Sequence, residues 1–529
     1  MSKAFKITGD CIPENNYMVD ISSRLDQISG MVDKGQYFVI NRARQYGKTT
    51  TLSLLKRQLI KKYRVWSLTF EGLSTESFAS EDIFVRDFLE DILLPEICRS
   101  DDAVAKMIED FVARPERTRI TKLGTLLNKI CSIYDGKVVM IIDEVDQACN
   151  NKVFIDFLAV LRKMYLGRSS GNASFQSVIL ASVYDIKNMR IKIRPDSEHR
   201  LNSPWNIAEP FRVDMSFTTT DISKMLREYE SDQDFKIDVD WFSRQIYAYT
   251  SGYPYLVSYI CKLLDEVVCD EPEFGCKKAA WTEDGFQRAI KIILTTRSTL
   301  FDDMIKKMND YPKLKALTED ILLQGLEVPN NPDNQILQLG FTFGFFSQLD
   351  GKAVIANRIF ETRIYNWLIS EVTENSHIFK LGDAEKNLFV KNGMLDMDCI
   401  LQRFKLHYDS LYGDKEQSFL EHEGRFLFLT FLKPIINGVG NYYIEAQTRD
   451  QKRTDIIVDY HGRQYIIETK IWHGEEYQAK GRKQLCDYLD IYHQTVGWLV
   501  SFCFNRNKNL KTDFKTIKEN GKVIKEVII

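Results

Sequence analysis

The sequence predicts an α/β protein: an N-terminal part built on a parallel sheet, a helical connection, and a second, C-terminal α/β domain. An apolar run, Tyr37-Phe38-Val39-Ile40, is followed by Gly47-Lys48-Thr49 and a helical run. After Lys137, the run from Val138 to Ile142 is apolar without alternation, as in a strand buried on both faces of a parallel sheet, and it ends in Asp143-Glu144. Farther on, two apolar strands around residues 456 and 466 carry acidic and basic side chains.

The segment from Asn41 to Thr50 has the composition and context of a phosphate-binding loop. It lies between a strand and a helix start, where free backbone N–H groups and the helix dipole attract phosphate. Lys48 is expected to reach the β- and γ-phosphates of ATP, and the Thr49 hydroxyl to join the coordination of Mg²⁺. The generic pattern has glycine where this chain has Arg42. The residues expected to bind nucleotide are Arg44, Gln45, Tyr46, Gly47, Lys48, Thr49, Thr50 and Asp143.

The two carboxylates after the second apolar run match the second motif of nucleoside triphosphatases. Asp143 is expected to hold Mg²⁺ and Glu144 to polarise the water that attacks the γ-phosphate. A solvated strand end followed by a helix cap is the alternative, and the upstream Gly47-Lys48-Thr49 favours the nucleotide interpretation. Ser182 ends a third apolar run and is expected either to contact the γ-phosphate or water, or to serve packing alone.

The middle of the chain predicts a helical module attached to the sheet. Residues 211–217 are expected to form the last core strand, and helices begin at about residue 221. The Gly252-Tyr253-Pro254 segment opens a helix, and it either faces a nucleotide or simply starts that helix. Residues 296–370 predict a winged-helix module with a hairpin from Leu339-Gly340-Phe341 and Phe345-Phe346 to Val354-Ile355.

Composition restricts the class of protein only broadly. At 529 residues the chain exceeds one hydrophobic core, and its formal net charge of -3 favours no partner. No apolar run is long enough to span a bilayer, so we expect no membrane partner. The 10 cysteines include no C-x-x-C pair, and the N-terminus lacks a secretory segment. We therefore expect a cytoplasmic protein with reduced thiols.

The C-terminal part carries the side chains of a metal-dependent nuclease. Glu468 and Lys470 are two apart on a strand and share a face, and Asp455 is expected beside them on the preceding strand of a hairpin. Asp455 and Glu468 could bind Mg²⁺, and Lys470 could orient or deprotonate the attacking water. Glu421 or Glu423 could complete the metal shell, and Gln484 could position its helix or bind phosphate. An exposed, charged hairpin face is the alternative, but the adjoining residues are too apolar for it.

The N-terminal part resembles the bacterial and archaeal AAA-ATPase-like family, whose loop usually reads Arg-Pro-Arg-Arg-Phe-Gly-Lys-Ser. Here the loop runs from Arg42 to Thr49, with Ala43 in place of Pro and Gln45 in place of Arg. That family also lacks the first glycine, and the resemblance covers about residues 10–370. The C-terminal part resembles the PD-(D/E)XK nuclease superfamily. Its first acid would be Asp455, its E-x-K would be Glu468 and Lys470, its late glutamine would be Gln484, and Thr454 replaces its Pro.

Together these patterns predict a P-loop ATPase core at 1–220, a helical and winged-helix lid at 221–375, and a nuclease domain at 376–529. We expect ATP and Mg²⁺ as cofactors, and a nucleic acid, most simply DNA, as partner. Nucleotide state would gate the nuclease. The alternative is a nucleotide-switched protein whose nuclease-like domain only holds nucleic acid. The sequence leaves open whether the protein forms a homo-oligomer.

Overall fold

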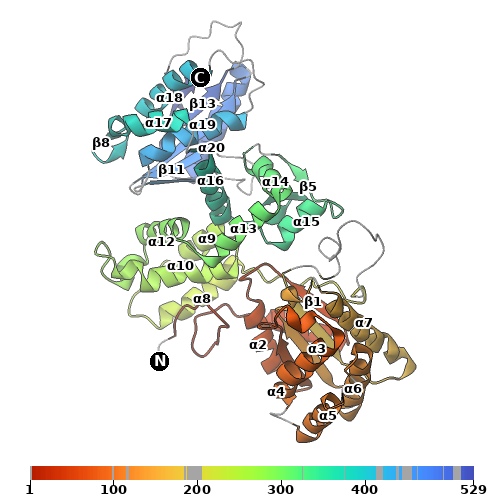
Figure 1. The fold of residues 1–529 in the computed structure, drawn as a ribbon. Helices are drawn as coiled ribbons and strands as arrows, with labels where there is room; N and C mark the ends of the chain where they lie inside the picture. The colour runs from red at the N-terminus through yellow and green to blue at the C-terminus, as the bar shows by residue number, and fades with distance from the viewer. Residues whose placement is uncertain are drawn as a thin grey trace.

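The computed structural model shows an N-terminal α/β module, a helical middle and a C-terminal α/β module at the opposite end (Figure 1). It describes residues 3–97, 101–114, 118–149, 151–183, 186, 205–323, 326–373, 376–412, 421–436, 440–443, 456–460, 463–472, 474–492, 494–503 and 514–529. No helix among these residues is both long and apolar enough to cross a membrane.

Four parallel strands form the N-terminal sheet, in the order β1-β4-β3-β2. Residues 138–142 of β3 are all buried, which confirms the prediction of a strand covered on both faces. Because the strands are parallel, the loop after β1 and the acids after β3 lie at the same edge of the sheet. The strands are β1 (Phe38–Asn41), β2 (Arg64–Thr69), β3 (Val138–Asp143) and β4 (Ser177–Ser182).

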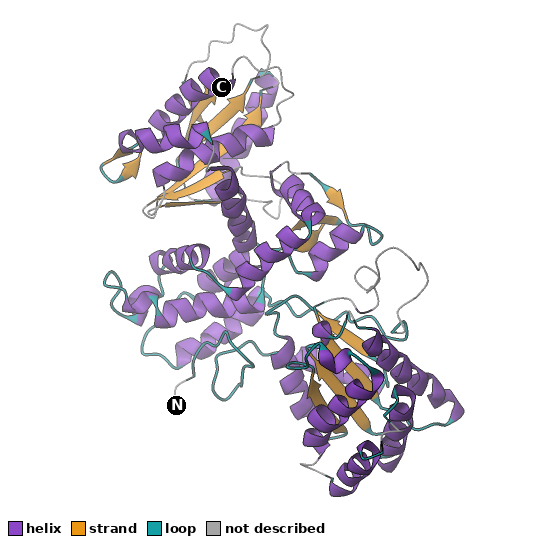
Figure 2. Ribbon diagram, in the orientation of Figure 1, coloured by secondary structure: helices purple, strands orange, loops and turns teal. Residues whose placement is uncertain are grey.

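Helices cover both faces of this sheet (Figure 2). One face holds a largely aromatic core that includes Trp66, Phe70, Phe84, Phe88 and Phe154. Residues 80–133 are largely helical in the part that the structure describes. The helices are α1 (Ser22–Asp33), α2 (Lys48–Leu59), α3 (Glu81–Asp87), a π-helical segment η2 (Phe88–Leu93), α4 (Leu94–Ile97), α5 (Asp102–Val112), α6 (Ile120–Ile133) and α7 (Lys152–Gly167).

The predicted last core strand at residues 211–217 is wrong. This segment forms no strand, and just before it an isolated bridge joins Glu209 to Phe38 of β1. Arginine side chains occupy the carbonyl groups that a neighbouring strand would need. Arg42 donates to the Val213 carbonyl at 2.7 Å, and Arg24 donates to the Asp214 and Ser216 carbonyls at 2.9 and 2.7 Å.

The helical region after the sheet begins at a reciprocal N-cap. The Thr218 side chain accepts a hydrogen bond from the Asp221 N–H, and the Asp221 carboxylate accepts one from the Thr218 N–H. Farther along, Pro254 occupies the first turn of α10, where its missing N–H costs nothing. The helices are α8 (Thr219–Ser231), α9 (Val239–Thr250), α10 (Pro254–Glu266), α11 (Lys277–Ala280) and α12 (Glu283–Thr295).

A compact unit of helices and a three-stranded sheet follows, in the region where the sequence predicts a winged-helix module; we call residues 299–355 the winged unit. The predicted hairpin is present at β6 and β7, but Leu339-Gly340-Phe341 is helical, because Asn334 caps α15 by accepting from the Ile336 and Leu337 N–H groups. The elements are α13 (Thr299–Asp310), α14 (Pro312–Leu323), β5 (Val328–Pro329), α15 (Gln335–Thr342), β6 (Phe346–Leu349), β7 (Lys352–Ile355) and α16 (Arg358–Thr373).

The C-terminal module is a six-stranded mixed sheet in the order β10-β11-β12-β13-β15-β14. Strands β11 and β12 form the expected antiparallel hairpin, and β12 then pairs in parallel with β13. The strands of this sheet are β10 (Gly440–Tyr443), β11 (Ile456–Tyr460), β12 (Arg463–Ile471), β13 (Val496–Phe502), β14 (Lys515–Glu519) and β15 (Lys522–Ile528). A separate two-stranded sheet is formed by β8 (Val390–Lys391) and β9 (Met394–Leu395). The helices are α17 (His377–Glu385), α18 (Met397–Tyr412), α19 (Glu421–Ile436) and α20 (Glu475–Ile491).

Helix α16 connects the middle of the molecule to this sheet. It contacts α9 and α12 on one side and α19 and β10 on the other. One continuous hydrophobic core extends from Phe5 near the N-terminus through the helical middle to Ile529.

Candidate nucleotide site and nuclease-like centre

The loop between β1 and α2 is shaped by backbone in the left-handed region. Gln45 has φ 56° and Gly47 has φ 77°, and the N-cap of α2 is Gly47. Lys48 is the first residue of the helix, and its Nζ donates to the carbonyl oxygens of Arg42 and Ala43, each at 3.0 Å. The lysine therefore folds back along the loop, and the first N–H groups of α2 lie at its tip.

Arg42, which stands where the generic pattern has glycine, turns away from this loop. Its guanidinium lies 5.0 Å from the Phe211 ring centroid and donates to the Val213 carbonyl. Ala43, where the resembling family has Pro, is 4% exposed and faces Gly344 of the winged unit. Both departures from the pattern thus have structural partners outside the loop's inner surface.

Thr49 meets the predicted acidic strand end directly. Its hydroxyl donates to the Asp143 carboxylate at 3.2 Å, and Glu144 follows with φ 55°. Burial raises the pKa of Asp143 and the pKa of Glu144, and the neighbouring Asp143 charge raises the pKa of Glu144 further. Burial lowers the pKa of Lys48, against the attraction of the nearby carboxylates. The site thus holds opposite charges in a poorly solvated space.

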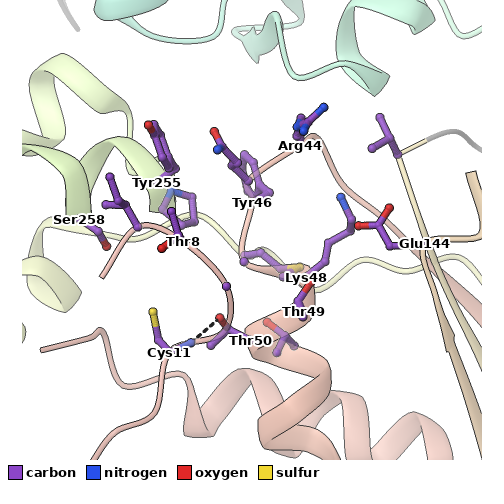
Figure 3. Close-up of a pocket in the computed structure, with 18 of the residues that line it drawn as sticks. Thr8, Cys11, Arg44, Tyr46, Lys48, Thr49, Thr50, Glu144, Tyr255 and Ser258 are labelled. Carbon is purple, nitrogen blue, oxygen red and sulfur yellow. Dashed lines mark hydrogen bonds between the residues drawn. The ribbon is translucent and has the colours of Figure 1, made fainter. Parts of the chain in front are cut away.

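These residues line one cavity of about 840 Å³ (Figure 3). Lys48 and Glu144 lie on one side of it, and Tyr255 and Ser258 of α10 lie on the other. The N-terminal segment 6–11 contributes a further wall, fixed by a hydrogen bond from the Cys11 N–H to the Thr50 hydroxyl at 3.1 Å. Of the nucleotide-binding residues predicted, the lining includes Arg44, Gln45, Tyr46, Gly47, Lys48, Thr49 and Thr50, and it also includes the catalytic candidate Glu144. Asp143 is not among the lining residues but accepts the hydrogen bond from Thr49.

The Gly252-Tyr253-Pro254 segment both starts a helix and lies at the cavity. Pro254 is among its lining residues. The Tyr253 hydroxyl donates to the Arg44 carbonyl, and its ring meets that of Tyr46 edge-on at 4.7 Å between centroids. The Tyr46 hydroxyl is in turn hydrogen-bonded to the Ser216 hydroxyl at 2.7 Å. The α10 start is therefore fastened to the loop.

Ser182 and Asp146 form a pair that the sequence patterns only half predict. Ser182 is fully buried and its hydroxyl donates to Asp146 at 2.7 Å, while the Val183 N–H donates to the same carboxylate. Asp146, in turn, lines the cavity. Sequence reasoning missed Asp146; its signal was a third acid just after Asp143-Glu144, with Val145 between them.

In the C-terminal module, the structure brings Glu468 and Lys470 together on β12. Lys470 Nζ lies 2.9 Å from Glu468 Oε1, and the Glu468 side chain is fully buried while that of Lys470 is 18% exposed. Asp455 lies outside the described residues. Glu423 belongs to α19, whose first side chains are likewise outside the description. Gln484 is on α20 and half-buried.

Gln478, also on α20, is a polar residue that sequence reasoning missed. Its Oε1 accepts from the buried Ser501 hydroxyl at 2.9 Å, and Ser501 pairs with Lys470 across β12 and β13. One turn later, Gly481 packs against Lys470, where a Cβ would lie 3.7 Å from Lys470 Cγ. Gln478 is thus hydrogen-bonded to Ser501 of β13, the residue that pairs with Lys470 of β12. Its signal was weak, because Gln484 fits the superfamily pattern.

Some of the basic residues near this module already have acidic partners. Arg482 pairs with Glu526 at 2.7 Å and with Glu519 at 3.4 Å, Lys522 pairs with Asp490 at 2.8 Å, and Lys525 pairs with Asp398. These side chains therefore add little to a surface for phosphate. Within the described part of the chain, no group of three or more His, Cys, Asp or Glu side chains is placed to hold a metal ion.

Known proteins resemble this chain only in part. No known protein family and no curated protein matches its sequence. A Walker-type ATPase of Pyrococcus abyssi superposes on 68% of this chain and 99% of its own, at 10% identity and TM-score 0.46. The RuvB Holliday junction branch migration motor of Thermotoga maritima superposes on 63% of this chain and 90% of its own, at 11% identity and TM-score 0.31. The ADP form of the Aeropyrum pernix ORC2 protein superposes on 69% of this chain and 96% of its own, at 12% identity and TM-score 0.33.

Because these identities and TM-scores are low, assignment rests on the residues themselves. The order β1-β4-β3-β2 with a Gly-Lys-Thr loop after β1 and paired acids after β3 defines the N-terminal module as a P-loop nucleoside triphosphatase fold.

Proposed function

We propose that this protein binds and hydrolyses ATP at the cavity between β1, β3 and α10. The observation that carries this is the meeting of Thr49 and Asp143 at 3.2 Å beside Lys48 and Glu144 in one cavity of about 840 Å³. A volume of this size suits a nucleotide. The helical and winged regions at 221–375 act as the lid of the ATPase core at 1–220.

Each residue then has a distinct task. The N–H groups at the start of α2 hold the phosphates, and Lys48 exchanges its loop carbonyls for phosphate oxygens. Thr49 and Asp143 offer the hard oxygen ligands that suit Mg²⁺, which would neutralise phosphate charge. Glu144 orients the attacking water and accepts its proton, a task for which its raised pKa suits it.

Two variants test the ATPase. Lys48→Ala should abolish nucleotide binding, because it removes the cation at the phosphates. Glu144→Gln should keep binding and lose turnover by about a hundredfold or more, the usual contribution of a general base. Binding is measured by calorimetry and turnover by phosphate release. If Lys48→Ala binds and hydrolyses ATP as the wild type does, the assignment is wrong.

We further propose that the 376–529 module is a Mg²⁺-dependent nuclease acting on DNA, gated by the nucleotide state. The supporting observation is the buried Glu468 beside Lys470, since a fully buried carboxylate in an apolar sheet needs a charged partner or ligand. By the superfamily resemblance, Asp455 and Glu423 would join Glu468 in holding Mg²⁺, which would make water more acidic. Lys470 would orient that water, and Gln484 would bind phosphate.

The nuclease is tested by incubating plasmid and linear DNA with Mg²⁺, with and without ATP, using wild type and Lys470→Ala. We expect chelator and Lys470→Ala to stop cleavage, and Lys48→Ala to change its ATP dependence. DNA that is retained but never cut would instead support the alternative, a nucleotide-switched binding protein with an inactive nuclease-like domain. Cleavage indifferent to both chelator and Lys470→Ala would exclude this active site.

A further inference from the structure

Helix α13, which follows α12 in the chain, forms part of the wall of the nucleotide cavity. Asp303, Lys306, Lys307 and Asp310 of α13 are lining residues, as is Tyr311 just beyond it. The loop and this helix are also joined directly, since the Gln45 side-chain amide donates to the Thr299 hydroxyl at 3.3 Å. Helix α13, which is far from the loop in sequence, therefore forms part of the site.

An ion network crosses from the loop to α13. Asp303 lies 3.0 Å from Lys307 and 4.0 Å from Arg44 of the loop. Lys307 also lies 4.5 Å from the Phe343 ring centroid, and its side chain is only 14% exposed. The aromatic ring and Asp303 thus hold the ammonium of Lys307 at a partly buried position facing the cavity.

Lys307 and Lys48 face the same space. Both side chains line the cavity, and their ammonium groups carry like charge. Two partly desolvated cations beside one cavity repel each other, and an anion bound between them removes that repulsion. Lys48 and Glu144 mark the end of the cavity where the γ-phosphate would lie.

We propose that Lys307 is a γ-phosphate-binding residue supplied by the winged-helix unit. On binding ATP, Lys307 turns from Asp303 to the γ-phosphate, so that α13 and the elements after it sense whether the third phosphate is present. This rests on the proposed ATP site. Asp303 is then a positioning residue, which holds Lys307 and Arg44 at the cavity.

The test uses the full chain and compares Lys307→Met with Lys315→Met. Lys315 is a matched control: it pairs with Glu371 at 2.6 Å and lies 4.6 Å from the Trp367 ring centroid, but it is not among the cavity's lining residues. Methionine keeps most of the length of the side chain without its charge, and the thermal unfolding temperature without nucleotide checks the fold. Binding of ADP and of the β,γ-imido analogue of ATP is measured by calorimetry.

We expect Lys307→Met to weaken binding of the ATP analogue by about tenfold or more, the loss of one charge-assisted hydrogen bond. ADP affinity should change less, Lys315→Met should match the wild type for both ligands, and Lys307→Arg should restore part of the loss. Equal affinities for Lys307→Met and Lys315→Met, or equal losses for both nucleotides, would overturn the assignment. Lys48→Ala separates the two hypotheses, because unchanged binding there would refute the ATP site itself.

Discussion

At the scale of single residues, Asp221 links helix α8 to Arg24 of helix α1. Burial alone would raise the pKa of Asp221, but hydrogen bonds from the Thr218 N–H and from Arg24, at 3.0 and 2.8 Å, outweigh it and lower that pKa. A carboxylate with a lowered folded-state pKa stabilises the protein above its unfolded pKa, and this stabilisation disappears as the pH falls through the folded value.

We therefore predict that Asp221→Asn lowers the free energy of unfolding by about 1–2 kcal/mol at neutral pH, as loss of an N-terminal cap and ion pair does. The difference from the wild type should shrink at acidic pH, which thermal melts across a pH series would measure. Asp240→Asn is the control, because its pair with Arg227 at 3.5 Å is 70% exposed on the Asp240 side and contributes little. A deficit that stays constant at all pH values would contradict the linkage.

Residue patterns predicted which loop and strand-end residues gather at the cavity better than they predicted its other walls. Lys48, Thr49, Asp143 and Glu144 could be read from spacing, because strand, loop and helix are local in sequence. Asp146 and Lys307 could not, since their positions depend on how β4 and α13 pack against the loop. The same limit applies to Gln478, which Ser501 of a distant strand holds in place.

At the scale of elements, the start of α10 depends on a close backbone contact. Gly252 has φ 74°, and a Cβ there would lie 1.9 Å from the Phe217 carbonyl oxygen. The backbone N–H of Phe217 also donates to the Gly252 carbonyl oxygen at 2.8 Å. Neither backbone segment can move aside without breaking this hydrogen bond. The sequence predicted a helix start here, but not the contact that requires glycine.

Gly252→Ala should thus destabilise the protein by about 2 kcal/mol or more, combining backbone strain with a steric clash. Gly275→Ala is matched to it, because Gly275 has φ 67° with nothing within 4 Å of the added Cβ, and it should cost only about 1 kcal/mol. Chemical denaturation of both variants measures the difference. Equal costs would show that the contact with Phe217 is not tight.

Strand prediction failed at this scale for a reason specific to these elements. Residues 211–217 are apolar enough for a strand, but Arg24 and Arg42 bond to three of their carbonyl groups. Likewise, Leu339-Gly340-Phe341 is apolar and was assigned to a hairpin, but the Asn334 cap starts a helix before it. Competing side-chain hydrogen bonds decided both cases, and a hydrophobic pattern does not reveal them.

At the scale of the whole molecule, the winged unit touches the phosphate loop through two small residues. A Cβ on Gly344 would lie 2.5 Å from the Ala43 Cβ, so that any side chain would separate the unit from the loop. Gly344→Ala should therefore weaken nucleotide binding, with Gly351→Ala as control, since Gly351 has φ 77° and nothing within 4 Å of its added Cβ.

The test of this contact is a double-mutant cycle. Ala43→Gly introduced into Gly344→Ala should recover stability by about 1 kcal/mol, the usual coupling of residues in contact. Denaturation and nucleotide titration of the four proteins provide the measurements. Strict additivity would mean that the loop and the winged unit do not share this contact.

Helix α16 has a mechanical consequence for the molecule. Its first turns are fixed by Arg358, 4.4 Å from the Tyr249 ring centroid, and by Arg363, which donates to the Leu294 carbonyl at 2.5 Å. Its other contacts are with α19 and β10. A helix of 16 residues is about 24 Å long. A rigid helix of this length that tilted by about 10° at one end would displace its other end by about 4 Å. A displacement of that size exceeds the distance range over which a hydrogen bond holds.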